Sequence, residues 1–303
     1  MDSGILLLDK PRGLSSNAAL QRVRLLYHKS KAGHVGSLDP LASGMLPICL
    51  GEATKVAGDI LAGRKRYRFT VSLGARTVTG DAEGSVSETA AVPSLERAQV
   101  EAALARFPGR CVQIPPMYSA LKRAGRPLYR LARAGVTVER TPRPIELSEL
   151  TLVALAPATL ELETLCSKGT YVRVLAEDIA VALGTLGHVT ALRRLYVEPF
   201  EREPMHSLES LTAARARGEG PALLAVDWPL ANLPAVHLTA LETRRVCHGQ
   251  RVMARLSGAP SRVRLYDEVG KFLGIGAADA TGAVHPRRLL NPTVHSAATE
   301  RCR

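Results

Sequence analysis

The stretch from residue 33 to residue 51, GHVGSLDPLASGMLPICLG, contains a single acidic residue, Asp39, placed directly before a proline. Three glycines, Gly33, Gly36 and Gly44, permit positive φ or close backbone approach, and the proline favours a turn after the acid. An isolated Asp-Pro pair is typical of a turn in which the carboxylate caps its own backbone. In this setting of small and turn-forming residues, the stretch instead predicts a loop of fixed shape that presents one functional group.

A lone carboxylate limits the chemistry that the chain can perform. The sequence has no cysteine–histidine cluster with zinc spacing, no P-loop and no G-x-G-x-x-G motif. A carboxylate can stabilise, or bond to, the oxocarbenium-like sugar carbon of a glycosidic bond, but an ordinary leaving oxygen then needs a second, acidic group. Uracil delocalises its negative charge, so that one carboxylate suffices when uracil leaves. If the detached base then re-bonds through C5, the reaction consumes no cofactor and requires no metal.

The composition indicates a polyanionic partner. Among 303 residues, 40 Lys and Arg stand against 28 Asp and Glu, which gives a net charge of +12. This excess favours nucleic acid, and the length favours one large domain with a smaller one. Five scattered cysteines predict free thiols in a reducing compartment, and no apolar run approaches a membrane span. We therefore expect a cytoplasmic protein that has no membrane contact.

Local sequence signals predict an alternation of strands and helices in the first two thirds of the chain. Capping residues, alternating apolar positions and glycine stops set the expected boundaries. The expected elements are a buried strand over 4–9, a helix capped by Ser15 or Ser16 that runs to about Tyr27, a strand over 67–74, a helix near 95–107, two strands over 150–166 broken at Pro157, and a loop, short strand and helix over 167–184 that Gly184 ends.

The segment from residue 113 to residue 135, QIPPMYSALKRAGRPLYRLARAG, differs from its surroundings. Its two prolines block regular structure before what we expect to be a basic helical stretch. A solvated cationic face and an RNA-contact face are both compatible with such a charge run. The cations are Lys122, Arg123, Arg126, Arg130 and Arg133.

The last third changes character between residues 230 and 237. Short strand-like segments such as RVMARL and SRVRLYDEVGKFLGIGAA are separated by glycine-containing turns, which predicts a small all-β module. The basic tail after Pro292 is expected to lack order.

The 33–51 stretch closely resembles the signature GHxGTLDPxAxGxLP of the TruB family of pseudouridine synthases, with Ser37 where Thr is usual. The segment DKPRGLSS resembles a second family motif, and QIPPMYSALK resembles the thumb insertion. The resemblance implies an α+β pseudouridine-synthase fold, with a mixed, largely antiparallel sheet flanked by helices. It further implies a catalytic domain over 1–232 with a thumb insertion at about 76–146, and a PUA-like β domain for RNA binding, with its basic tail, over 233–303.

The resemblance also assigns roles to individual residues. Asp39 is the expected nucleophile, Arg173 an ion-pair partner that keeps it ionised and aimed, and Tyr67 a ring that stacks on the target base and whose hydroxyl is a candidate proton acceptor. His34 is expected to fill the gap left in the RNA loop, with Tyr171 and Leu192 also contacting substrate. The support of the site is expected from Lys10, Pro11 and Gly13, and thumb contacts to RNA from Lys122, Arg123 and Arg126.

The activity implied is the conversion of uridine 55 to pseudouridine in the T-loop of tRNA, on a base flipped out of the RNA. Other RNAs with T-loop-like hairpins are possible substrates, and we expect a monomer that needs neither cofactor, metal nor obligatory protein partner. Two alternatives stay open: a non-catalytic RNA-binding or RNA-folding module, and a guide-RNA-dependent synthase, against which the thumb-like insertion argues. The sequence leaves open a covalent adduct at C1′ or a glycal-type route, and which residue handles the C5 proton.

Overall fold

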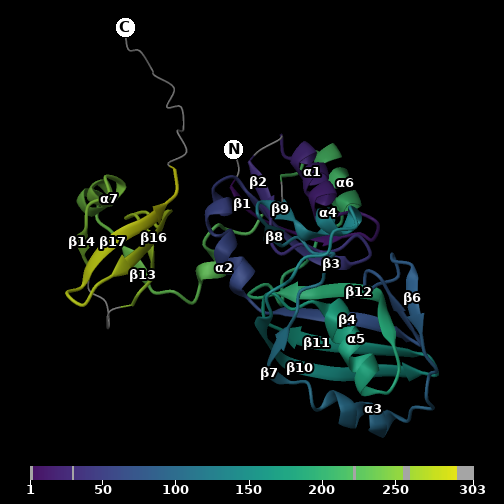
Figure 1. The fold of residues 1–303 in the computed structure, drawn as a ribbon. Coiled ribbons are helices and arrows are strands. Elements are labelled where there is room, and N and C mark those ends of the chain that lie inside the picture. Colours follow the sequence, from purple (N-terminus) through teal and green to yellow (C-terminus); the bar gives the residue numbers. More distant parts are fainter. Residues whose placement is uncertain (1–2, 29–30, 221–222, 255–259, 292–303) are drawn as a thin grey trace.

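A computed structural model describes residues 3–28, 31–220, 223–254 and 260–291 of the chain. Its main feature is an eight-stranded sheet with the order β1-β3-β12-β4-β11-β10-β7, in which β2 also pairs with β3 (Figure 1). All neighbouring strands are antiparallel except β12 and β3. The strands are β1 Gly4–Lys10, β2 Ala32–His34, β3 Ser43–Leu50, β4 Lys65–Leu73, β7 Gly109–Gln113, β10 Arg143–Ala156, β11 Thr159–Cys166 and β12 Gly187–Val197.

This sheet confirms the α+β prediction, and the helices around it begin where capping residues predict. Helix α1 (Ser16–Leu26) starts after Ser15, whose side chain accepts from the backbone N–H of Ala18. Helix α5 (Val172–Ala182) is followed by Gly184 at φ 79°, a left-handed position that favours glycine. Two more helices are α3 (Arg97–Leu104) and α6 (Leu208–Ala216), and a short two-stranded sheet joins β5 (Ala75–Thr77) to β6 (Val86–Thr89).

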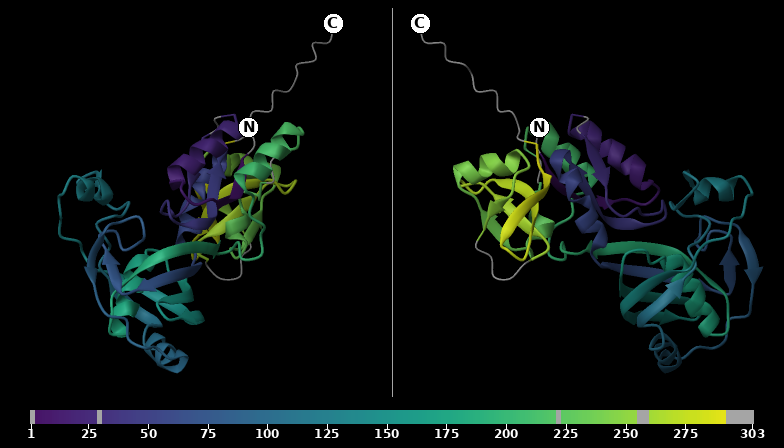
Figure 2. Two further views of the ribbon diagram at one scale, coloured as in Figure 1. Left: turned by 90° about the vertical axis from the view of Figure 1, so that its right-hand side faces the viewer. Right: turned by 60° about the vertical axis from the view of Figure 1, so that its left-hand side comes forward.

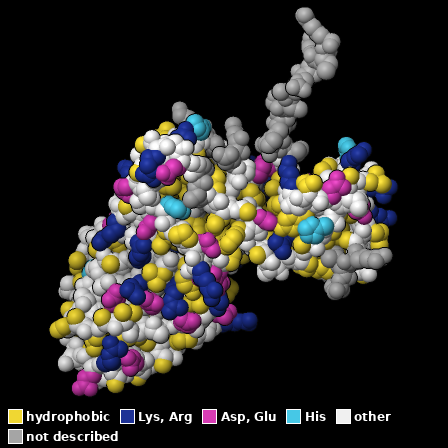
Figure 3. Space-filling model, turned by 180° about the vertical axis from the view of Figure 1, so that it is seen from behind, with side chains coloured by type: hydrophobic (Ala, Val, Ile, Leu, Met, Phe, Trp, Pro, Cys, Tyr) yellow, Lys and Arg dark blue, Asp and Glu magenta, His cyan; other side chains and the backbone are white. Residues whose placement is uncertain are grey.

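Strand β4 shows how the sheet separates its two faces. Its residues alternate, with Tyr67, Phe69 and Val71 buried in the main apolar core. On the other face Arg66 and Arg68 both pair with Glu163 of β11. Basic and acidic side chains are interleaved on the outside of this lobe (Figure 3), so this face is charge-balanced rather than basic.

Two local predictions are wrong. Lys122, Arg123 and Arg126 lie on a β-hairpin, β8 (Lys122–Arg123) with β9 (Arg126–Pro127), and only the residues after it form a helix, α4 (Leu128–Arg133). The turn places Ala124 and Gly125 at φ 48° and 79°, as a tight hairpin requires. The short strand expected within 167–184 is absent, because that described segment passes from a loop directly into α5.

The C-terminal part builds a separate five-stranded sheet, ordered β13-β15-β16-β17-β14, around its own apolar cluster. It stands to one side of the main sheet (Figures 1 and 2). The expectation of an all-β module is wrong, because this part also contains a helix, α7 (Ala240–Cys247). The helix begins in a capping box between Thr239 and Glu242. The strands are β13 Ala235–His237, β14 Val252–Met253, β15 Val263–Tyr266, β16 Phe272–Ala278 and β17 Ala283–Leu289. The tail after Pro292, and part of RVMARL, lie outside the described residues.

Two other expectations bear on the described residues. Cys49, Cys111, Cys166 and Cys247 are free thiols there, as predicted. No helix in the described part of the chain is long and apolar enough to cross a membrane.

Candidate active site

Asp39 lies in the connection between β2 and β3, and several hydrogen bonds hold this connection in place. The Ser16 hydroxyl of α1 both accepts from the backbone N–H of Leu38 at 2.7 Å and donates to its carbonyl at 2.9 Å. Gly36 and Gly44 have φ of 69° and 98°, as expected, whereas Gly33 has neither positive φ nor a close neighbour. The loop is therefore anchored at Leu38, and the backbone N–H of Gly13 donates to the carbonyl of Pro40 on the other side of the acid. The prediction for Gly33 is wrong.

Arg173 holds the carboxylate from the first turn of α5. Its Nε lies 3.0 Å from Asp39 Oδ2, which confirms the predicted ion pair. The other nitrogens of the guanidinium donate to the backbone carbonyls of Thr79 and Tyr118, each at 2.7 Å. The Arg173 side chain is 6% exposed and Nε also lies 3.7 Å from Asp81. With its outer nitrogens fixed on backbone, the arginine orients the carboxylate rather than following it.

The surroundings of Asp39 push its pKa in two directions. Removal of water by the pocket walls raises the pKa of this carboxyl above its ordinary value, and the nearby Asp81 adds to the rise. Arg173 and Lys10 act against it. The side chain is nevertheless 40% exposed, because it faces an open pocket. Arg173 thus offsets part of a rise that burial would otherwise impose in full.

That pocket has a volume of about 480 Å³ and unites all six predicted catalytic and substrate-contacting residues. It draws on the acidic loop, β4, residues 119–121, the 167–173 loop and β12, which are widely separated in sequence. Its predicted residues are His34, Asp39, Tyr67, Tyr171, Arg173 and Leu192, and among its further lining residues are Leu38, Leu61, Lys65, Ser119, Leu121 and Arg194.

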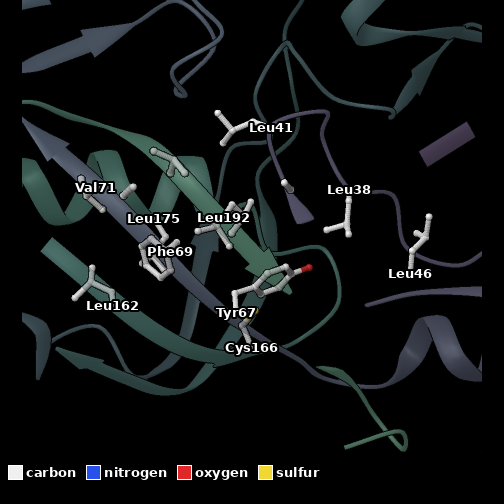
Figure 4. Packing of buried hydrophobic residues seen from close by; sticks show 14 of the residues in the cluster. Leu38, Leu41, Leu46, Tyr67, Phe69, Val71, Leu162, Cys166, Leu175 and Leu192 are labelled. Carbon is white, nitrogen blue, oxygen red and sulfur yellow. The ribbon is translucent and has the colours of Figure 1, made fainter. Parts of the chain in front are cut away.

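Tyr67 and Leu192 form an apolar part of the pocket wall. They come from adjacent strands, β4 and β12, and are 9% and 8% exposed. The Tyr67 hydroxyl points away from Phe69 and Val71 (Figure 4) and lies 3.5 Å from Arg194 Nη1. Burial raises the pKa of this phenol, which favours its neutral form. A neutral ring beside a leucine is suited to hold a flat base.

Tyr171 and His34 occupy other parts of the lining. The backbone N–H of Tyr171 donates to the Gln113 side chain at 2.9 Å, which fixes the residue just before α5. Burial raises the pKa of the Tyr171 hydroxyl and lowers that of His34, where Arg194 adds to the effect. Both side chains are therefore favoured in their neutral forms.

The second motif lies beneath the loop. Lys10 is fully buried, and its ammonium donates to the carbonyls of Pro11 and Leu14 at 2.9 and 2.6 Å. Burial lowers the pKa of Lys10 to about 8. Gly13, at φ 81°, donates its backbone N–H to the carbonyl of Pro40, the residue after Asp39. These contacts connect the motif to the acidic loop.

The thumb cations are placed differently. Lys122, Arg123 and Arg126 are exposed on the β8–β9 hairpin and do not line the pocket. Ser119 and Leu121, directly before the hairpin, do line it. The cations of the hairpin thus follow the pocket-lining residues directly in sequence, but they are exposed to solvent and lie outside the pocket.

Three buried charged residues at or beside the pocket, Arg194, Lys65 and Asp81, were not predicted from the sequence. Arg194 is 1% exposed and donates to the carbonyls of Met45 and Gly36 at 2.7 and 2.8 Å, so it joins β12 to the acidic loop. Lys65 and Asp81 are 5% and 3% exposed. Only Arg194 carried a sequence signal, because it stands two positions after Leu192 in a strand and therefore on the same face. Within the described residues, no group of three or more His, Cys, Asp or Glu is placed to hold a metal ion.

Comparison with known proteins agrees with this geometry. Residues 24–172 match the model of the TruB family pseudouridylate synthase N-terminal domain, residues 173–226 that of the tRNA pseudouridylate synthase B C-terminal domain, and residues 234–290 that of the C-terminal part of pseudouridine synthase II TruB. The chain is 50% identical to the tRNA pseudouridine synthase B of Chromohalobacter salexigens over 95% of this chain and 94% of that one. The chain belongs to the TruB family of tRNA pseudouridine synthases. It is therefore an isomerase.

Other relatives support the same family. The tRNA pseudouridine synthase B of Burkholderia mallei is also 50% identical, over 95% of this chain and 96% of its own length. Among solved structures, a chain in the crystal structure of a Cbf5-Nop10-Gar1 complex superposes with a TM-score of 0.72 at 22% identity, covering 95% of this chain and 85% of that one. At that identity the likeness concerns the fold, which is that of a pseudouridine synthase with a C-terminal β module.

Proposed function

We propose that this TruB-family isomerase converts uridine 55 in the T-loop of tRNA to pseudouridine, with Asp39 as the residue that acts on the ribose. The observation that carries the proposal is the Asp39–Arg173 ion pair, at 3.0 Å, on the floor of a pocket whose wall includes Tyr67 and Leu192. A fixed carboxylate beside a flat apolar wall fits a reaction in which a base leaves a sugar carbon and stays bound.

The chemistry follows from what each side chain offers. The target base enters the pocket after leaving its stack, and the ring of Tyr67 stacks on it while Leu192 contacts it. Asp39 either bonds to C1′ or removes a proton at C2′, and in both routes the N1–C1′ bond breaks. The uracil turns and C5 bonds to C1′. In this step the Asp39–C1′ bond breaks in the first route, and Asp39 returns the proton to C2′ in the second. The C5 proton then leaves to solvent. A phenol kept neutral is a weak base, so we assign stacking to Tyr67 rather than the acceptance of that proton.

Binding of the RNA is assigned to other parts of the molecule. The cations Lys122, Arg123 and Arg126 of the hairpin contact phosphates of the T-arm, and His34 fills the position vacated by the flipped base. We assign the catalytic domain to 1–232, with a thumb at about 76–146, and a PUA-like RNA-binding domain to 233–303. The net charge of +12 supports a salt-sensitive association of this kind with tRNA. We assign the activity to a monomer.

The proposal is tested on a bare tRNA transcript carrying tritium at C5 of its uridines. The isolated protein, in the presence of a chelator, should release the tritium of one uridine per tRNA, and a transcript with cytidine at position 55 should release none. Release from another position would contradict the site assignment. No release by the isolated chain would favour the non-catalytic or guide-dependent alternatives instead.

A further inference from the structure

The segment between β3 and β4 contacts the C-terminal sheet at one end and the uridine pocket at the other. It comprises the 3₁₀ turn η1 (Gly51–Lys55) and the short helix α2 (Ala57–Ala62), followed by the turn into β4. Figure 1 shows α2 on the side of the main lobe that faces the C-terminal sheet. Leu61 of this segment and Lys65 at the start of β4 line the pocket, but the proposed function gives neither a role.

Polar contacts attach the C-terminal part to η1. The Lys55 ammonium donates to the carbonyl of Leu289 at 2.8 Å, and the Lys55 carbonyl accepts from Arg288 at 2.8 Å. Glu52 accepts from the backbone N–H of Asn291 at 2.6 Å. These contacts involve the end of β17 and the residues directly after it, so η1 is fixed to the last strand of the C-terminal sheet.

Helix α2 carries its own contacts to the same sheet. Asp59 pairs with Arg262 at 2.5 Å, and Ile275 of β16 packs in one apolar cluster with Val56 and Ile60. Val56 and Ile60 are nearly inaccessible to solvent. The position of α2 is thus determined jointly by both parts of the chain.

The other end of α2 reaches the pocket through Leu61. This side chain lines the pocket and is 45% exposed, so its apolar surface is accessible to a nucleotide that enters. The buried ammonium of Lys65 donates to the carbonyls of Leu61 and Gly63, at 2.6 and 2.5 Å. Arg64 in the same turn donates to the Glu198 carboxylate, directly after β12, through its backbone N–H, Nε and Nη2. Leu61 therefore sits on a short, braced segment rather than on a loose loop.

We propose that Leu61 is a positioning residue for the target nucleotide, and that the seating of the C-terminal sheet on α2 sets where Leu61 lies. The inference rests on the proposed function and adds to it. In this account the C-terminal sheet contributes to the rate of the chemical step, in addition to any contact of its own with RNA. The apolar Leu61 packs against the nucleotide that enters the pocket, and a displacement of α2 withdraws that contact.

The first test is Leu61→Ala, with Leu25→Ala as the matched control. Leu25 is 67% exposed on α1 and does not line the pocket. Single-turnover tritium release is measured at saturating enzyme on an isolated T-arm hairpin. We expect Leu61→Ala to lower the rate constant about tenfold, because a misplaced reactant loses rate steeply, and Leu25→Ala to stay within about twofold. A Leu61→Ala rate equal to that of the parent overturns the proposal.

The second test separates coupling from RNA binding. Arg262→Ala should lower the same rate constant by about threefold at saturation, with an unchanged Kd for the hairpin, and Arg262→Lys should restore most of it. If Arg262→Ala weakens only the Kd of whole tRNA, the C-terminal sheet merely binds RNA and the coupling is refuted. The double variant Leu61→Ala/Arg262→Ala should lose less than the product of the single losses, since both act through one contact; a full product contradicts the proposal.

These outcomes differ from a failure of the proposed function. If the parent protein releases no tritium, the function itself fails. If the parent is active and the variants match it, only the role of Leu61 and α2 fails.

Discussion

The charges around Asp39 and those on the thumb hairpin differ in how the protein holds them. Arg173, Arg194 and Lys10 are at most 6% exposed and donate to backbone carbonyls. Lys122 and Arg126 are exposed at the tip of a two-stranded hairpin. A buried cation is costly unless its partners are fixed, whereas an exposed one costs little and attracts any phosphate. On this comparison, we propose that the buried cations around Asp39 set the geometry of the chemical step, and that the exposed cations of the hairpin set the affinity for RNA.

The largest effect that sharpens this comparison is expected at Arg173. Arg173→Lys keeps a positive charge but cannot reach Asp39 and both the Thr79 and Tyr118 carbonyls in one plane. The single-turnover rate constant should fall by about 10²-fold or more, a size typical of removing a preorganised electrostatic interaction. The Kd for tRNA, measured by filter binding, should stay within about twofold. A variant that binds poorly but reacts at the parent rate would break the division between the two groups.

A second effect concerns the backbone beneath the pocket. Gly44 has φ 98°, and a Cβ there would lie 2.1 Å from the carbonyl oxygen of Arg194. Gly44→Ala should therefore lower the free energy of unfolding by about 3 kcal/mol, the sum of strain and overpacking. Gly33→Ala is the matched control, since nothing lies within 4 Å of its added Cβ. Chemical denaturation measures the free energy of unfolding of both variants. Equal values would show that β3 does not approach the Arg194 carbonyl of β12 as closely as described.

The exposed group should give a smaller and different effect. Replacing Lys122, Arg123 and Arg126 by Gln should weaken tRNA binding by about tenfold. The slope of log Kd against the logarithm of the salt concentration should fall by about one unit for each phosphate that the hairpin no longer neutralises. The rate constant at saturation should not change. The matched control removes three exposed cations at the far end of the main sheet, Arg97, Arg106 and Arg110. If the control weakens binding equally, net charge alone is responsible and the hairpin has no special role.

The smallest effect is a shift in pH dependence. In the proposed function the reaction requires ionised Asp39, so kcat/KM should rise with pH as the carboxyl loses its proton. Because burial raises the pKa of Asp39, this rise should occur above the ordinary value of 3.8. Circular dichroism over the same range serves as the control for unfolding. If kcat/KM instead rises at or below pH 3.8, Arg173 lowers the pKa of Asp39 by more than burial raises it.

The sequence predicts local features of this protein well and long-range ones only through resemblance. Ser15 as a helix cap and Gly184 as a helix stop are written in a few adjacent residues, and the structure confirms both. The pairing of Asp39 with Arg173 joins residues that are far apart in the chain. No spacing rule connects them, and the family motifs alone indicated it.

The errors have physical causes. The hairpin at residues 122–127 was predicted as helix because its basic residues also suit a helix, although Ala124-Gly125 already permitted the tight turn. Helix α7 was missed although Thr239 and Glu242 have capping-box spacing. The spacing from Leu192 indicated the face of the strand on which Arg194 lies, but not the partners that allow its burial, because the carbonyls that hold it come from Met45 and Gly36 in distant segments.

The central claim is that the carboxylate of Asp39 performs the isomerisation, and Asp39→Asn tests it most directly. Asparagine keeps the size of the side chain and removes its charge. Single-turnover tritium release on the T-arm hairpin, with a chelator present, should fall by more than about 10³-fold, as for the loss of a nucleophile, while the Kd for the hairpin stays near that of the parent. An Asp39→Asn protein that releases tritium at the parent rate would contradict the account.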